Sequence, residues 1–156
     1  MSNIVKSEGQ LNVLLVGNNP IDLSRTQQGL TEIQNHKVTT ETAFDVLSIN
    51  ERLNRFSPNF ILLDDNLGLV GLHTIVQTLQ THRKTRHVPI TVLKNSNYEE
   101  TAHWGVLNYV LKQATTGEGL YKAFLNSLKC RRTQQNLRQA YQKRSRQVRN
   151  RSLFTD

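Results

Sequence analysis

The sequence predicts an α/β domain built on a parallel β-sheet with helices on both of its faces. Two observations carry this prediction. Short apolar strand candidates alternate with segments of helical spacing along most of the chain. The apolar run Phe60-Ile61-Leu62-Leu63 then ends in the carboxylate of Asp64, as expected for a central strand of a parallel sheet. The predicted strands are 11–17, 36–40, 59–64, 88–93 and 107–111.

Helical spacing of apolar residues predicts the elements between these strands. Pro20 suits the first turn of the first helix, where its missing N–H costs nothing, and Thr42 can cap the second helix. The last helix begins near Thr116 and has no proline or glycine after its first turns. It is therefore expected to run to about Arg149, far beyond the average helix length. The other predicted helices are 21–34, 43–54 and 71–82.

Size and composition exclude several classes of protein. A chain of 156 residues fits one domain plus an appendage. Residues 1–10 lack the apolar stretch of a secretory signal, and no run approaches the length of a membrane span. The single cysteine, Cys130, excludes an internal disulfide and a cysteine cluster for zinc. A soluble, cytoplasmic protein is expected.

The positive charge of the chain is concentrated at its C-terminal end. Residues 129–156 contain nine lysines and arginines against one acidic residue, Asp156, a net charge of +8 that equals the net charge of the whole chain. The body is therefore formally neutral. The basic segment is compatible with a solvated helix, with a helical linker that pairs in a dimer, or with binding to nucleic acid.

Polar residues stand at the ends of the predicted strands. Asn18 follows the first strand, Asp64 ends the third, Lys94 follows the fourth and Lys112 follows the fifth. Because open α/β sheets place their ligands at the carboxyl ends of the strands, we expect these side chains to form the functional site.

These segments, in this order, resemble a receiver domain, the response-regulator module of two-component phosphorelays. The resemblance covers about residues 10–128 and implies a five-stranded parallel sheet in flavodoxin-like order 2-1-3-4-5, here with an extended C-terminal helix. It divides the chain into a receiver-like domain (1–128) and a basic helical extension or linker (129–156). The matching segments are Leu14 to Pro20, Ile61 to Leu67, Pro89 to Lys94 and Asn108 to Lys112.

The resemblance also implies a chemistry. In receivers, three carboxylates bind Mg²⁺, an aspartate accepts a phosphoryl group, and a lysine and a Thr or Ser hydroxyl contact that group. It thus identifies Asp64 as the candidate phospho-acceptor and Lys112 as the lysine. Gly17 and Asn18 stand in place of the acidic pair, and Lys94 replaces the hydroxyl.

These replacements predict a weak metal site. Asp64, Asn18 and the Asn66 carbonyl could touch a cation, but a neutral amide holds Mg²⁺ poorly. Mg²⁺ is expected only if the chain works as a conventional receiver, and no other cofactor is implied. Our hypothesis is that Lys94, Lys112 and Asp64, with Asp65 as a further candidate, form a metal-free charge cluster.

The predicted function is signal transduction by a degenerate, pseudo-receiver module that is not an enzyme and acts through protein–protein contacts. The first alternative is a conventional receiver phosphorylated on Asp64 by a histidine kinase. The second is a nucleic-acid-associated protein that uses the basic tail, which the lack of interleaved aromatic residues disfavours. A homodimer through the last helix would use a seam of Leu137, Tyr141, Arg144 and Val148, which Arg144 interrupts.

Overall fold

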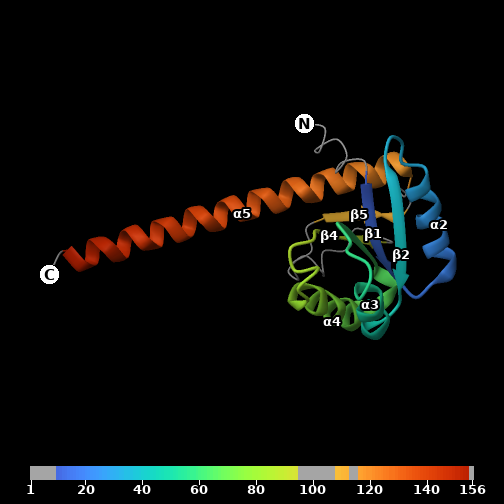
Figure 1. The fold of residues 1–156 in the computed structure, drawn as a ribbon, viewed down its shortest axis with the longest axis horizontal. Helices are drawn as coiled ribbons and strands as arrows, with labels where there is room; N and C mark the ends of the chain where they lie inside the picture. Colours follow the sequence, from blue (N-terminus) through green and yellow to red (C-terminus); the bar gives the residue numbers. More distant parts are fainter. Residues whose placement is uncertain (1–9, 95–107, 113–115, 155–156) are drawn as a thin grey trace.

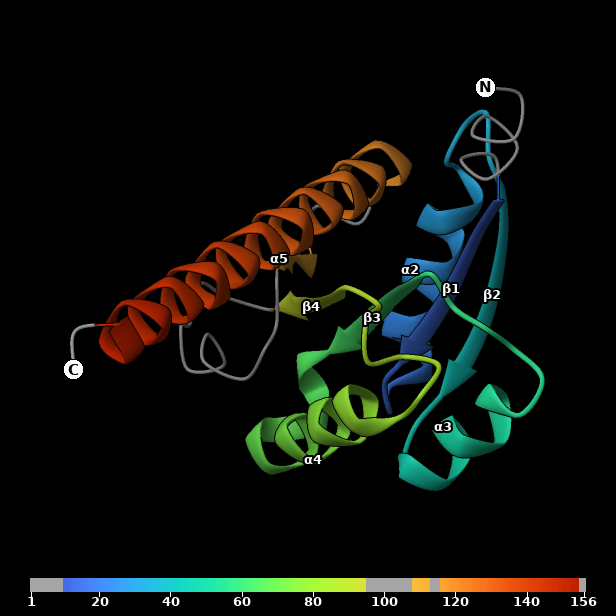
Figure 2. The same cartoon turned by 60° about the vertical axis from the view of Figure 1, so that its left-hand side comes forward.

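A computed structural model describes residues 10–94, 108–112 and 116–154. Its five strands form one parallel sheet in the order β2-β1-β3-β4-β5, which confirms the predicted fold class and strand order. Figures 1 and 2 show the helices packed on both faces of this sheet. The strands are β1 (Gln10–Val16), β2 (Lys37–Ala43), β3 (Phe60–Asp64), β4 (Ile90–Lys94) and β5 (Asn108–Leu111). The helices are α2 (Pro20–Thr31), α3 (Val46–Leu53), the short 3₁₀ helix η1 (Asp65–Leu67), α4 (Gly68–Thr81) and α5 (Gly117–Phe154).

Alternation along the central strands divides the core into two layers. Successive side chains of a strand point to opposite faces, so β1 sends Leu14 and Val16 one way and Val13 and Leu15 the other. The first layer packs against α3 and α4, and the second packs against α2 and α5. All five residues of β3 are buried, as expected for the middle strand of a sheet that is covered on both faces.

The first residues of the helices confirm one sequence-based prediction and contradict another. Pro20 is the first residue of α2, and the Asn19 side chain accepts hydrogen bonds from two backbone N–H groups of its first turn. The prediction that Thr42 caps the second helix is wrong, because Thr42 lies within β2. Asp45 caps α3 instead, in a reciprocal capping box with Ser48.

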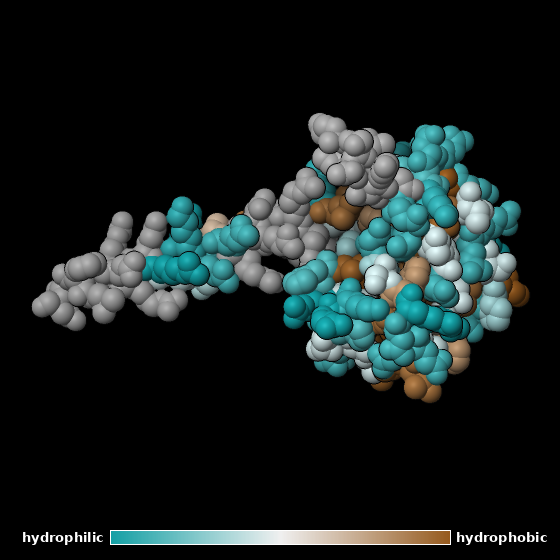
Figure 3. All heavy atoms as spheres, in the orientation of Figure 1, coloured by the Kyte–Doolittle hydropathy of each residue, from teal (hydrophilic) through white to brown (hydrophobic). Residues whose placement is uncertain are grey.

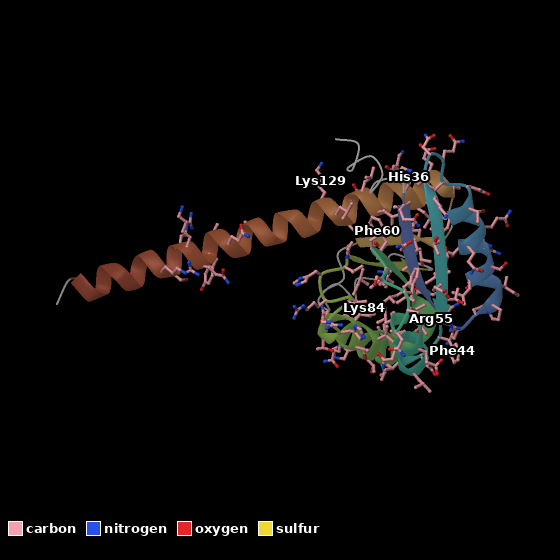
Figure 4. All side chains as sticks on the ribbon, in the orientation of Figure 1. His36, Phe44, Arg55, Phe60, Lys84 and Lys129 are labelled. Carbon is pink, nitrogen blue, oxygen red and sulfur yellow. The ribbon has the colours of Figure 1, made fainter. Side chains whose placement is uncertain are left out.

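The last helix leaves the body of the molecule. Its first turns pack on the sheet through Leu120, Ala123, Phe124 and Ser127, all of which are buried. Beyond Lys129, at the point where α5 leaves the body in Figure 4, the helix projects away (Figure 1). Within the described part of the chain, no helix is long and apolar enough to cross a membrane. Residues 95–105, where the sequence leaves room for two or three helical turns at most, lie within the segment 95–107, which is outside the described residues.

Candidate functional site

The candidate site lies at the carboxyl edge of the sheet. Asp64 is the last residue of β3, and the register places it beside Leu93 of β4, one residue before Lys94. Lys112 follows the last residue of β5. Asp64 is only 1% exposed, so its carboxylate is almost entirely removed from water and needs partners that offset this cost.

Lys112 supplies a positively charged partner. Its Nζ lies 2.8 Å from Oδ1 of Asp64, 3.2 Å from Oδ2 of Asp22 and 3.3 Å from Oδ1 of Asp65. One ammonium group therefore forms ion pairs with three carboxylates that come from α2, β3 and η1. The predicted pairing of Lys112 with Asp64 and Asp65 is present in the structure, and we name Lys112 with its three aspartates the Lys112 cluster.

The backbone after β3 also binds Asp64. Oδ1 of Asp64 accepts a hydrogen bond of 2.8 Å from the backbone N–H of Asn66, so the carboxylate caps the turn that follows its own strand. The same oxygen is the one paired with Lys112. The ammonium and the backbone donor thus hold this carboxylate oxygen in place from two sides.

Asp22 is the member of the cluster that the sequence reasoning missed. It lies in the first turn of α2, where an acidic residue is commonly explained by its favourable interaction with the helix dipole. Its Oδ2 accepts a hydrogen bond of 2.7 Å from Nδ2 of Asn66, in addition to the hydrogen bond from Lys112. The hydrogen bond from Lys112 is the main reason why the pKa of Asp22 is lowered below its usual value.

The pKa of Lys112 reflects opposing influences. Burial lowers the pKa of this ammonium, because it disfavours the charged form. The hydrogen bond to Asp64 and its charge, together with Asp22 and Asp65, outweigh burial, so that the pKa is raised above its usual value. Lys112 is thus a charged lysine at neutral pH.

The end of β1 supplies no carboxylate to this cluster. A Cβ atom at Gly17 would lie 2.8 Å from Cδ2 of Leu23 and 3.0 Å from Cβ of Asp64, so any side chain here requires its neighbours to move. The next residue, Asn18, donates from Nδ2 to the backbone carbonyl of Asn66 at 3.5 Å. The three residues of the predicted weak metal site, Asp64, Asn18 and Asn66, therefore lie together. The Asn18 amide donates to the Asn66 carbonyl oxygen, which was expected to face the cation.

Lys94 is buried at the end of β4, with 7% of its surface exposed. In the sheet register Lys94 pairs with Leu111, the residue that precedes Lys112. The burial of Lys94 agrees with a side chain that lies inside the site rather than in solvent. The ion pairs described above are those of Lys112. Membership of Lys94 in the charge cluster stays a prediction.

Comparison with known proteins identifies the fold. No protein-family model and no curated protein sequence matches the chain. Solved structures do match. The bacteriophytochrome response regulator RtBRR is 21% identical with a TM-score of 0.61, over 86% of this chain and 96% of that chain. The bacteriophytochrome response regulator AtBRR is 26% identical with a TM-score of 0.61, over 76% and 92%.

A third match is the receiver domain of a sensor histidine kinase. The receiver domain of sensor histidine kinase PA1611 from Pseudomonas aeruginosa PAO1, solved with magnesium in its active-site cleft, is 17% identical with a TM-score of 0.64, over 77% of this chain and 98% of that chain. The strand order, the position of Asp64 and these similarities lead to one conclusion: the chain has the fold of response-regulator receiver domains.

Proposed function

We propose that this chain is a receiver-like signalling module whose phospho-acceptor site is held in one state by the Lys112 cluster, without phosphorylation or a metal ion. In this proposal it signals by protein–protein contact and is not an enzyme. The observation that carries the proposal is the position of Lys112 Nζ, within 3.3 Å of Asp22, Asp64 and Asp65.

The charges of the cluster support this proposal. An ammonium in contact with three carboxylates offsets part of their mutual repulsion, which is the role of a divalent cation in a conventional receiver. A divalent ion bound beside Lys112 would need carboxylates at the end of β1 to offset the added positive charge, and positions 17 and 18 supply none. The residues that are present therefore do not fit a magnesium ion well.

The donor set supports it as well. Among the described residues, no group of three or more His, Cys, Asp and Glu side chains is placed to hold a metal ion. Position 17 has no side chain, and Asn18 presents a neutral amide that already donates to the Asn66 carbonyl. The buried Lys94 would add a further positive charge where receivers carry a hydroxyl.

One observation favours the conventional receiver as a second candidate. The acceptor position and the lysine are both present, and their side chains are in contact at 2.8 Å. In this alternative a histidine kinase would phosphorylate Asp64, with Mg²⁺ bound weakly. The two candidates differ in whether the Asp64 carboxylate is available to attack a phosphoryl donor.

Phosphorylation of the full chain separates these candidates. The protein would be incubated with acetyl phosphate and MgCl₂ and its intact mass followed over time, with a conventional receiver as positive control. We expect no phosphoryl adduct on this chain under conditions that label the control fully. Adduct formation that disappears in Asp64→Asn would establish the conventional receiver and overturn the proposal.

Titration with MgCl₂ in a calorimeter supplies a second readout. We expect no saturable magnesium binding by the wild-type protein at concentrations that saturate the control receiver. Saturable binding that is lost in Asp64→Asn would contradict a metal-free cluster, even if phosphorylation were not seen.

A further inference from the structure

Beyond Ser127, none of the α5 side chains that the structure describes is buried against the body. Leu128 and Lys129 are already exposed. Leu137 and Tyr141 are 66% and 73% exposed, although both are large side chains with much apolar surface. Figure 3 shows mostly hydrophilic side chains among those described on this part of the helix.

The two exposed residues belong to an uncharged face of the helix. Positions three and four residues apart share a face, which places 137, 141, 145 and 148 on one side of α5. These positions carry Leu137, Tyr141, Ser145 and Val148, which we name the 137–148 stripe. None of them is charged. Arg144, three residues after Tyr141 and four before Val148, lies at the edge of this stripe by the same spacing.

Basic side chains flank this stripe. Lys143, Arg144 and Arg146 are exposed, and residues 129–156 contain nine basic residues in all. After Glu118 no acidic residue follows until Asp156, so the helix offers its basic residues no i,i+4 partner of opposite sign in this region. Like charges at this spacing destabilise a helix, and an isolated helix is marginal in water.

The charge also decides between partners. Two copies of this helix side by side would bring two segments of net charge +8 together, which disfavours pairing with a second copy. A polyanion such as DNA would neutralise the charge but would leave Leu137 and Tyr141 unused. An acidic amphipathic helix satisfies both features, because its apolar residues cover the stripe and its carboxylates meet the flanking basic residues.

We propose that the 137–148 stripe is the docking surface for an acidic, amphipathic helix of a protein partner. This goes beyond the proposed function, since it assigns an interaction surface and the chemistry of its partner without depending on the state of the Lys112 cluster. Ordering of the helix and binding would then be coupled, since the partner supplies both the apolar contacts and the negative charges that α5 lacks.

Binding of the full chain to defined probes tests this proposal. The probe is a labelled four-heptad peptide with Leu at its core positions and Glu at the flanking positions. Its binding is measured by fluorescence anisotropy. Comparison probes are polyglutamate of equal charge and a duplex DNA of similar length. We expect the amphipathic peptide to bind at least tenfold more tightly than polyglutamate at 0.15 M salt. We also expect Leu137→Gln/Tyr141→Gln to weaken this binding at least tenfold.

The matched control is Gln139→Ala/Gln142→Ala, which changes two exposed positions of the same helix outside the stripe and should leave binding within twofold. Circular dichroism of each variant verifies that the helix content is unchanged. Equal affinity for all polyanions, with no effect of the stripe variant, would overturn the proposal in favour of a general polyanion or nucleic-acid surface. Self-association in sedimentation that the stripe variant abolishes, or no binding to any probe, would overturn it too.

Discussion

The carboxylate of Asp22 lies 3.2 Å from the ammonium of Lys112, although ninety residues separate them in the chain. This contact joins the first turn of α2 to the end of β5, at opposite sides of β3. It makes Lys112 part of a three-carboxylate cluster rather than the partner of Asp64 alone. The predictions below test what each part of this arrangement contributes.

Replacing Lys112 should be the most damaging change in the cluster. Lys112→Met leaves the buried Asp64 carboxylate without its closest cation, and breaking such a pair on one side costs about 3 kcal/mol. We expect this loss in the free energy of unfolding measured by urea denaturation. Adding Asp64→Asn to Lys112→Met removes the unpaired charge and should restore part of the stability. Equal stability of the single and double variants would show that the pair is not coupled.

Removing the charge of Asp22 should have a smaller effect. Asp22→Asn keeps an oxygen that can accept from Asn66 but loses the charge-assisted bond from Lys112, a loss of about 1 kcal/mol in the free energy of unfolding. Glu118→Gln is the matched control, because it removes an exposed carboxylate paired with Lys122 at i,i+4. That variant should change stability by less than about 0.5 kcal/mol. Indistinguishable effects would place Asp22 among ordinary surface charges.

The pH dependence of stability follows from the same contact. The folded-state pKa of Asp22 is lowered, so its contribution is present above the unfolded-state pKa and is lost as the pH falls through the folded value. The pKa of Lys112 is raised, so its contribution is present below the unfolded-state pKa and is lost as the pH rises through the folded value. As the pH falls below about 4, wild type should therefore lose stability faster than Asp22→Asn. Parallel curves from denaturation at each pH would contradict this.

Gly17 should not tolerate a side chain. In Gly17→Ala the new methyl group would meet Leu23 at 2.8 Å and Asp64 at 3.0 Å, and such overpacking costs about 1–3 kcal/mol. Gly71→Ala is the control, because its nearest neighbour is Leu67 at 3.6 Å and it lies within α4. Alanine there should stabilise the helix by about 0.5–1 kcal/mol. Thermal unfolding of both variants should thus shift in opposite directions.

Restoring one carboxylate should recover part of a metal site. Asn18→Asp replaces the amide donor on the Asn66 carbonyl by an acidic oxygen, the ligand type that Mg²⁺ prefers. We expect calorimetry to show saturable magnesium binding by this variant under conditions in which the wild-type protein shows none. The gain should disappear in Asn18→Asp/Asp64→Asn, and a gain that persists there would place the new site elsewhere.

Apolar patterning made the sheet predictable, whereas the details of its edge depended on tertiary contacts. The run from Phe60 to Leu63 has few alternatives to a buried strand, and strand β3 lies where it was expected. β2 was predicted as 36–40 but extends to Ala43, because pairing with β1 continues through polar residues that carry no apolar signal. The predicted N-cap of α3 was wrong because Thr42 belongs to this extension of β2. Asp45 with Ser48 forms the capping box instead, three residues later in the chain.

The site was predictable wherever a strand end fixed its position. Asp64 and Lys112 end or follow buried strands, so topology alone brings them to one edge. Asp22 lies on a helix, where the direction of the side chain depends on how the helix packs, and nothing in the sequence linked it to Lys112. Its place in the first turn of the helix that follows β1 is the signal that could have identified it.

The start of α5 rests against the end of α2 more closely than a side chain would allow. A Cβ atom at Gly117 would lie 2.7 Å from the carbonyl carbon of Glu32, so the two backbones are in direct contact. The part of α5 from Ser127, the last buried residue among its described side chains, to Phe154 is a lever arm of about 40 Å. A tilt of about 5° at its base would move the far tip by about 3.5 Å. Small displacements of α2, the helix that carries Asp22, would thereby be magnified at the distal end.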